Sequence, residues 1–144
     1  MKILKVNTED RRLGDFGENE AVRLLKRSGY KILERNYVAF DHEIDIIAEC
    51  SDVIAFIEVK TRTRGNINPR EPRPASAVTP KKQRAIISAA KVYIAFHPPK
   101  KHIRFDIIEV YVDKNEIGVM TLNEIKHLKG AFDNNTAHPT PYKR

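Results

Sequence analysis

VIAFIEVK, residues 53–60, is the segment from which the rest of this fold can be inferred. Residues 53–57 form an unbroken apolar run rich in β-branched types, which predicts a strand buried on both faces. Because side chains alternate along a strand, Glu58 and Lys60 leave its end on the same side, two residues apart. Burying an ionised group costs several kcal/mol unless the group is paired or bound to a metal ion. The segment therefore predicts a central strand that ends in a functional pair of charges.

The segment EIDIIA, residues 43–48, repeats this design immediately upstream. Alternation assigns its side chains to two faces, Glu43, Asp45 and Ile47 to one and Ile44 and Ile46 to the other. A tight connection at residues 50–52 makes the two segments neighbouring antiparallel strands. We therefore expect Asp45, Glu58 and Lys60 to converge. Two carboxylates and a nearby ammonium are suited to a hard metal ion with oxygen ligands.

Length and composition predict a single soluble domain. The chain has 144 residues, 41% of them hydrophobic and 31% charged, which is enough for one domain with a substantial core. We assign this domain to residues 1–132 and expect residues 133–144 to form a flexible C-terminal tail. There is no apolar run near about 18 residues and no signal-peptide core, so we expect an unexported protein without a membrane partner. Cys50 is the only cysteine, which excludes an intrachain disulfide and fits a cytoplasmic location.

The charge of the chain points to a polyanionic partner. The formal net charge is +7 at neutral pH. Such an excess of lysine and arginine favours nucleic acid first and an anionic membrane surface second. Because many basic domains bind neither, the charge narrows the class of partner without identifying it.

A first helix is expected from Thr8 or Asp10, either of which can cap its start, to about Ser28, with Gly29 as a left-handed stop. Small and apolar residues recur at helical spacing along one face of it, namely Leu13, Gly17, Ala21, Leu24 and Leu25. Glu18 borders this face. It is either a solvated surface carboxylate, which spacing alone favours, or a carboxylate that serves a site at the edge of the core.

Residues 61–78 form the longest stretch without a periodic pattern, and we expect a loop there. The stretch contains four arginines, Arg62, Arg64, Arg70 and Arg73, and its only acidic residue is Glu71. This composition favours a flap that closes on phosphate groups over the alternative of a solvated loop.

Thr79 and Pro80 mark the start of a second helix, as N-cap and first helical residue, and Pro98-Pro99 ends it. Its apolar face is expected to carry Ile86, Ala89, Ala90, Tyr93 and either Phe96 or His97. Lys81 and Lys82 lie in the first turn, where the helix dipole disfavours cations. They are either two solvated lysines or part of a phosphate site that uses the free N–H groups of the helix. Both interpretations stay open.

The remaining segments predict strands at residues 30–40, 103–112 and 116–120 and a short helix at residues 123–132. Asp106 lies beside Arg104 in the long strand, which favours a structural ion pair over a metal ligand. The order of elements is therefore helix, three strands, helix and two strands, which is an α/β arrangement.

Taken together, these residues resemble the small bacterial YraN family, and through it the PD-(D/E)XK nuclease superfamily that includes Holliday-junction resolvases. The resemblance spans residues 13–110 and rests on an ordered set of motifs: Gly17-Glu18-x-x-Ala21, Gly29-Tyr30, Asn36-Tyr37, residues 43–48 and 56–62, Lys81 or Lys82, and Arg104-Phe105-Asp106. It implies a restriction-endonuclease-like core, with a mixed central sheet of about five strands flanked by helices in the order αβββαββ. The resolvases dimerise, which implies a homodimer by analogy.

The resemblance also implies roles for individual residues. Asp45 and Glu58 would be metal ligands, with Glu18 as a third carboxylate at the same site. Lys60 would orient the attacking water and stabilise charge on the phosphate, and Gln83 matches loosely a glutamine found in some relatives. The implied cofactor is Mg²⁺ or Mn²⁺. His42 stands where relatives more often have glycine, and a surface imidazole is its favoured interpretation.

The function predicted is a metal-dependent endonuclease acting on double-stranded DNA, in particular branched or processed DNA. Phosphodiester hydrolysis needs a cation that polarises the phosphoryl oxygen, and two or three carboxylates suffice to hold Mg²⁺. Two alternatives remain open. One is a nucleic-acid-binding module that keeps the fold and the basic surface without turnover. For the endonuclease and for this module alike, the residues expected to contact nucleic acid are Arg62, Arg64, Arg70, Arg73, Lys81, Lys82 and Gln83. The other is a module that binds an acidic protein through the arginine loop.

Overall fold

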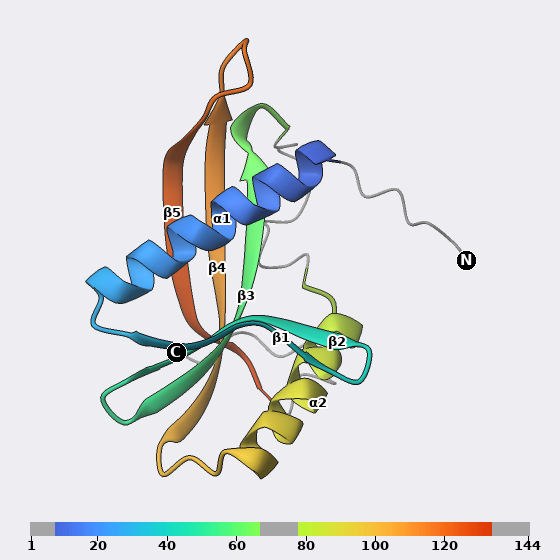
Figure 1. Cartoon of the computed structure of the whole chain (residues 1–144), viewed down its shortest axis with the longest axis vertical. Helices are drawn as coiled ribbons and strands as arrows, with labels where there is room; N and C mark the ends of the chain where they lie inside the picture. Colours follow the sequence, from blue (N-terminus) through green and yellow to red (C-terminus); the bar gives the residue numbers. More distant parts are fainter. Residues whose placement is uncertain (1–7, 67–77, 134–144) are drawn as a thin grey trace.

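The computed structural model describes residues 8–66 and 78–133. The elements follow in the order α1 (Thr8–Arg27), β1 (Lys31–Ala39), β2 (His42–Cys50), β3 (Val53–Thr63), the short 3₁₀ helix η1 (Arg64–Asn66), α2 (Pro80–Phe96), β4 (His102–Lys114) and β5 (Met120–Phe132). The predicted α/β class and the order αβββαββ are confirmed (Figure 1). The tail predicted for residues 133–144 lies outside the described residues, except Asp133.

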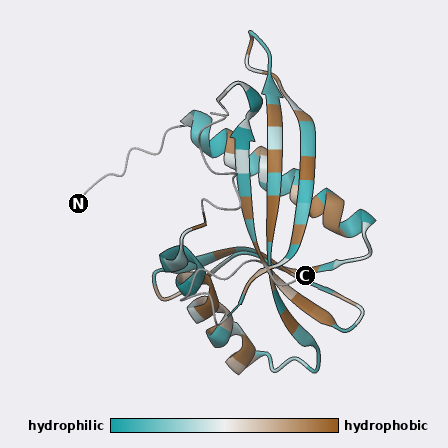
Figure 2. Cartoon of the chain, turned by 180° about the vertical axis from the view of Figure 1, so that it is seen from behind, coloured by the Kyte–Doolittle hydropathy of each residue, from teal (hydrophilic) through white to brown (hydrophobic). Residues whose placement is uncertain are grey.

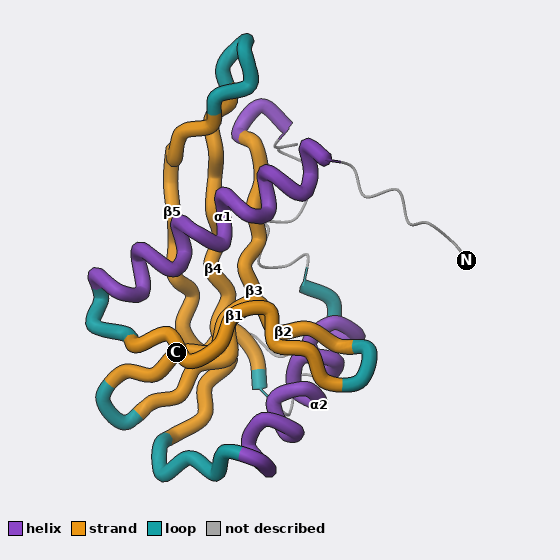
Figure 3. The backbone as a smooth tube through the Cα atoms, in the orientation of Figure 1, coloured by secondary structure: helices purple, strands orange, loops and turns teal. Residues whose placement is uncertain are grey.

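The five strands form one mixed sheet in the order β1-β2-β3-β4-β5. β3 and β4 are parallel, and the other neighbours are antiparallel. A parallel pair needs a crossover connection, and α2 lies in the crossover between these two strands. The β1–β2 hairpin runs across the direction of the upper parts of β3, β4 and β5, so the sheet is strongly coiled (Figure 3).

Two apolar clusters hold the helices against opposite faces of the sheet. On one face, Ala21 and Leu25 of α1 are fully buried against Ile57 of β3 and its neighbours. On the other face, Ile86 and Tyr93 of α2 belong to a cluster that includes Phe56, Ile107 and Phe105. Successive residues Phe56 and Ile57 thus serve different clusters, which confirms that β3 is buried on both faces. α2 covers only one end of its face, and hydrophilic and hydrophobic residues alternate along the uncovered parts of β3, β4 and β5 (Figure 2).

The helix ends agree with the sequence. Gly29 has φ +88°, the left-handed conformation expected after α1. Thr79 caps α2 by accepting a hydrogen bond from the Lys82 N–H, and Pro80 is the first helical residue. Of the two alternatives at the end of the apolar face, Phe96 is 77% exposed, and it is His97 that stacks on Tyr93.

The short helix predicted for residues 123–132 is wrong, because this segment is most of strand β5. Its residues pair with β4 from Tyr111↔Glu124 to Phe105↔Phe132. The predicted strand at residues 116–120 is also wrong except at its last residue. Those residues form the hairpin turn instead, in which the Asn115 side-chain oxygen accepts from the N–H groups of Ile117 and Val119. β4 has 13 residues, and the backbone N–H and C=O groups along its edge need hydrogen-bond partners. β5, which also has 13 residues, is long enough to provide them.

Two smaller expectations about the central strands need correction. β3 does not end at Lys60, because parallel pairing with β4 continues to Thr63↔Val112. Ile44 and Ile46 do not share a face, since Ile44 joins the α2 cluster and Ile46 the α1 cluster. Asn36 of β1, which lies between the pairs Arg35↔Ile46 and Tyr37↔Ile44, has φ +52°.

α1 crosses β3 so closely at Gly17 that no side chain fits there. A Cβ atom at Gly17 would collide with the Thr61 side chain, next to Lys60, whereas nothing lies within 4 Å of a Cβ at Gly14. We therefore expect Gly17→Ala to destabilise the fold by about 1–3 kcal/mol, although alanine favours helix.

The matched control is Gly14→Ala on the same helix, which is expected to be neutral or to stabilise by up to about 1 kcal/mol. Urea denaturation of both variants measures the difference. Equal stability of the two would show that α1 does not press on β3 at Thr61.

Candidate active site

The candidate site lies where β2 separates from β3. The two strands pair from Cys50↔Val53 to Ile46↔Ile57, and the next residues along each strand are Asp45 and Glu58. Beyond this point the Asp45 Oδ2 atom accepts a hydrogen bond from the Val59 N–H at 2.7 Å. The Asp45 side chain thus accepts the hydrogen bond of the Val59 N–H, which has no backbone partner on β2 beyond the last pair, Ile46↔Ile57. The fork fixes the position of one carboxylate directly beside the other.

Glu58 and Lys60 leave β3 on the same side, as the sequence predicted. The Lys60 Nζ atom lies 3.7 Å from the Glu58 Oε1 atom. Glu58 is only 5% exposed, and its Oε2 atom is buried without a hydrogen-bond partner. A buried carboxylate oxygen left in this way costs roughly 1–3 kcal/mol or more. Stability of the fold alone gives no reason for it.

The electrostatics of the pair show the cost of placing two carboxylates together. Burial, followed by the charge of Asp45, raises the pKa of Glu58 to about 8. Burial likewise raises the pKa of Asp45, and hydrogen bonds from the Val59 N–H and from the protonated Glu58 carboxyl act against this rise. The charges of Lys82 and Lys60 act in the opposite direction on both groups. The pair therefore retains a proton near neutral pH unless another cation joins it.

These properties fit a divalent cation with oxygen ligands. The unpartnered Glu58 Oε2 atom is a free ligand atom, and a cation between two carboxylates would remove their repulsion. Mg²⁺ is commonly bound by only one or two carboxylates together with water and substrate oxygens. Asp45 and Glu58 are therefore sufficient in kind and number.

Glu18 lies on the other side of Asp45. Burial, followed by the Asp45 charge, raises the pKa of Glu18 to about 7. Glu18, Asp45 and Lys60 line one small cavity of about 330 Å³. Within residues 8–66 and 78–133, however, no three His, Cys, Asp or Glu side chains form a group that could hold one metal ion. The role of Glu18 as a third ligand stays a prediction.

Asn36 was not recognised as a site residue from the sequence. With its amide nitrogen turned towards the two carboxylates, Asn36 donates hydrogen bonds of 2.9 Å to both Glu18 Oε1 and Glu43 Oε1. It thereby links α1 to the β1–β2 hairpin beside the site. The motif Asn36-Tyr37 was part of the family resemblance, but nothing in the sequence indicated this contact. His42 pairs with Ala39 at the end of the hairpin and is half-buried.

A buried acidic residue close to the site was also not recognised as part of it. Glu109 of β4 pairs in register with Lys60 and is almost fully buried. Its Oε2 atom accepts a hydrogen bond of 3.0 Å from the Tyr111 hydroxyl. The predicted ion pair on the same strand is confirmed, because Arg104 donates to both carboxylate oxygens of Asp106 at 2.8 Å.

The first turn of α2 faces the site through Lys82. Its charge reaches both carboxylates of the fork, whereas Lys81 is exposed. The Lys82 N–H is already bound to the Thr79 hydroxyl, and the Gln83 side chain donates to the Val78 carbonyl at 2.9 Å. Of the two lysines, Lys82 has an electrostatic connection to the site, and the phosphate-binding role stays a prediction.

The basic loop differs from the prediction. The first residues of the predicted loop, 61–66, belong to β3 and η1, and Arg64 has an acidic partner, Asp113, at 3.0 Å. Arg62 is exposed near the end of β3. Arg70 and Arg73 lie outside the described residues.

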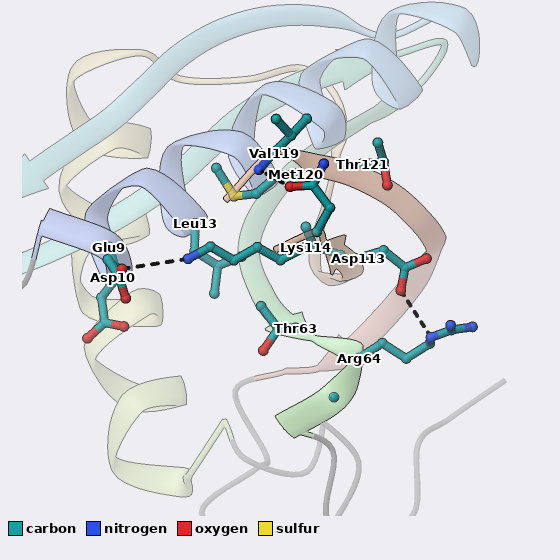
Figure 4. A pocket seen from close by; sticks show the side chains of 13 residues that line it. Glu9, Asp10, Leu13, Thr63, Arg64, Asp113, Lys114, Val119, Met120 and Thr121 are labelled. Atoms are coloured by element: carbon teal, nitrogen blue, oxygen red, sulfur yellow. Dashed lines mark hydrogen bonds and ion pairs between the residues drawn. The ribbon is translucent and has the colours of Figure 1, made fainter. Parts of the chain in front are cut away.

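A larger cleft of about 700 Å³ lies beyond the start of α1 (Figure 4). It shares Asp10 and Leu13 with the small cavity, so the two are neighbours. Two ion pairs lie at the cleft, Arg64–Asp113 at 3.0 Å and Lys114–Glu9 at 3.9 Å.

In the described part of the chain, no helix has the length and apolar character needed to span a membrane.

The chain is similar to proteins of one bacterial family. The profile of the family described as Uncharacterised protein family UPF0102 matches residues 17–110. A UPF0102 protein of Caldanaerobacter subterraneus subsp. tengcongensis is 42% identical over 129 residues, which are 89% of this chain and 98% of the relative. A UPF0102 protein of Chlorobaculum parvum is 45% identical over 121 residues, 83% of this chain and 91% of the relative. The matched region contains Glu18, Asp45, Glu58 and Lys60.

Proposed function

The chain belongs to the UPF0102 family, to which YraN also belongs, and from the geometry of its fork we propose that it is a metal-dependent endonuclease that hydrolyses phosphodiester bonds in DNA. The observation that carries the proposal is the pair of carboxylates beside Lys60, formed by half-buried Asp45 and buried Glu58, with Glu58 Oε2 unpartnered. Placing these charges together lowers the stability of the fold, so their presence points to a function. We propose branched or processed DNA as the substrate.

Asp45 and Glu58 would hold Mg²⁺ or Mn²⁺, since both supply carboxylate oxygens at one point of the sheet. When bound, the cation supplies polarisation of a phosphoryl oxygen and lowers the pKa of a nearby water. The Lys60 ammonium, 3.7 Å from Glu58 Oε1, stabilises the negative charge that develops on the phosphoryl oxygens. Lys82 attracts the DNA phosphate towards the fork, and Glu18 lines the cavity where it can orient a water molecule.

Lys60→Met tests the proposal without removing a metal ligand. In Mg²⁺ or Mn²⁺ the wild-type protein is expected to cut flapped and four-way DNA, and the variant to cut it about 100–1,000-fold more slowly. DNA binding in the absence of metal should change little, because one lysine among many basic residues is lost. Gel-based cleavage and fluorescence anisotropy on linear, flapped and four-way substrates measure the two quantities.

A specific observation favours a second candidate function, a nucleic-acid-binding module without turnover. The charges of two lysines, Lys60 and Lys82, act on the fork, and ammonium groups can bind phosphate without a metal ion. Salt-sensitive binding with no cleavage in any divalent metal would support this module and contradict the endonuclease. If the protein did not bind DNA with micromolar or higher affinity even at low salt, both the endonuclease and the binding module would be contradicted.

A further inference from the structure

The end of the β1–β2 hairpin presents one covered face and one open face. β2 is not paired with β3 beyond Ile46, so the end of the hairpin extends past the fork (Figure 3). One face packs against α2, with Ala39 and Ile44 in the cluster of Tyr93. The open side is defined by Val38 of β1 and by Phe40 in the turn, which are 63% and 79% exposed. Two large apolar side chains are thus exposed to solvent at the end of a two-stranded ribbon.

Phe40 occupies a backbone conformation that suits glycine. Its φ is +56°, in the left-handed region where a bulky side chain is disfavoured. The aromatic ring gains almost no burial in return, since it is 79% exposed. Neither the turn nor the core therefore explains a phenylalanine at this position. A residue held in an unfavourable conformation without compensation points to a role outside the fold.

The open face leads into the candidate site. Val38 is the cross-strand neighbour of Glu43, whose carboxylate shares the Asn36 amide with Glu18. Three to four residues of strand separate Asp45 from the turn, which corresponds to about 10–14 Å. A DNA strand advances about 3.4 Å per nucleotide, so the turn would meet DNA roughly three to four nucleotides from a phosphate held at the fork.

We propose that Phe40, flanked by Val38, stacks on an unpaired base of branched DNA bound at the fork. This inference rests on the proposed function and narrows its substrate to DNA with an unstacked base near the cleavage point. Aromatic side chains bind bases of any sequence, because every base offers a π-face. Apolar wedges inserted at a base step act in the same way on duplex that is already distorted. The net charge of +7 favours a polyanionic partner such as DNA over a basic or neutral one.

A second copy of the chain is the less suitable occupant. Stable interfaces bury about 800 Å² on each partner. The open face offers two apolar side chains, and Asp41 and Glu43 beside them are charged and exposed. This patch matches the size of one or two bases and falls short of a dimer interface.

Phe40→Gly provides the test, because glycine is favoured at φ +56° and the variant is expected to fold at least as stably as the wild type. In metal-free buffer, flapped DNA with 2-aminopurine at the branch should change fluorescence on binding the wild type but not the variant. The variant should bind this DNA about tenfold more weakly, which is the loss of one base stack, and bind linear duplex equally well.

Phe96→Ala is the matched control, since Phe96 is 77% exposed on α2, away from the turn. It should behave as the wild type in every measurement. Equal affinity and equal fluorescence change in Phe40→Gly would overturn the inference while leaving cleavage at the fork intact. A wild-type dimer that becomes a monomer in Phe40→Gly, with the same fluorescence change, would also overturn it. If the wild type showed the fluorescence change but never cleaved DNA, the stacking inference would be supported and only the proposed endonuclease activity would be contradicted.

Discussion

Glu58→Gln is expected to abolish metal-dependent DNA cleavage and to make the metal-free protein more stable. A neutral amide cannot replace an anionic metal ligand, and Lewis-acid stabilisation of the reaction is worth several kcal/mol. Since each 1.36 kcal/mol is tenfold in rate, we expect a loss of at least about a thousandfold. Cleavage of flapped DNA under single-turnover conditions in Mg²⁺ measures it.

The gain in stability follows from the pKa of Glu58. Burial and the Asp45 charge raise this pKa from 4.5 to about 8 in the folded protein. A group with a raised pKa contributes stability that is complete below its unfolded pKa and is lost as the pH rises through the folded pKa. The metal-free wild type should therefore weaken between about pH 5 and pH 8. The amide of the Glu58→Gln variant carries no charge and removes this loss, so the variant should be about 1–2 kcal/mol more stable at high pH.

Urea denaturation in EDTA at pH 5.5 and pH 8.5 measures this difference, with equal stability expected at the lower pH. Glu124→Gln is the control. Glu124 forms an exposed pair with Lys126 at 3.4 Å, so its loss should change neither cleavage nor stability by a measurable amount. A Glu58→Gln protein that cuts like the wild type, or that is less stable at both pH values, would contradict the assignment of Glu58 as a metal ligand.

The parts of the fold that the sequence predicted are those set by local patterns. Helix caps at Thr79 and Gly29 and the apolar run at residues 53–57 depend on neighbours in the chain, and all were confirmed. Strand β5 was missed because its side chains do not alternate clearly. Its identity comes from pairing with β4, which is set by the tertiary structure and overrides local preference.

The candidate site divides in the same way. Alternation along a strand was enough to place Glu58 and Lys60 together, and the tight connection between strands brought Asp45 beside them. The hydrogen bonds from Asn36 to Glu18 and Glu43 require the spatial approach of α1 to the hairpin. No spacing in the sequence encodes that approach. The same holds for Ile44, whose place in the α2 cluster is set by tertiary packing.

Asp106→Asn is expected to destabilise the fold more than Gly17→Ala does. Asp106 is 0% exposed, and its two oxygens receive hydrogen bonds from Arg104, from His127 at 2.7 Å and from the Gly130 N–H at 2.9 Å. Arg104 in turn donates to the Tyr30 hydroxyl at 2.6 Å, directly after the end of α1. This network, defined by Asp106 and its partners, ties β4, β5 and the end of α1 together.

Breaking a buried ion pair by removing one partner costs about 3–5 kcal/mol, because the other charge is left without compensation. For a chain of this size the melting temperature should fall by roughly 10 °C or more. Burial alone would raise the pKa of Asp106, but the hydrogen bonds from His127, Arg104 and Gly130 lower it below 3.8. Its stabilising contribution is therefore present above that value and lost as the pH falls through the folded pKa. The difference between wild type and variant should shrink below about pH 4.

The double variant Arg104→Met, Asp106→Leu separates charge from packing. Replacing both charged partners with apolar groups leaves no uncompensated charge, so the double variant should be more stable than Asp106→Asn alone. Thermal and urea denaturation at pH 7 and pH 4 provide the comparison. If Asp106→Asn lost less than about 1 kcal/mol at pH 7, as is typical of exposed pairs, the network would not hold α1 against the sheet. The close approach of α1 to β3 at Gly17 would then be the contact that keeps Glu18 beside Asp45.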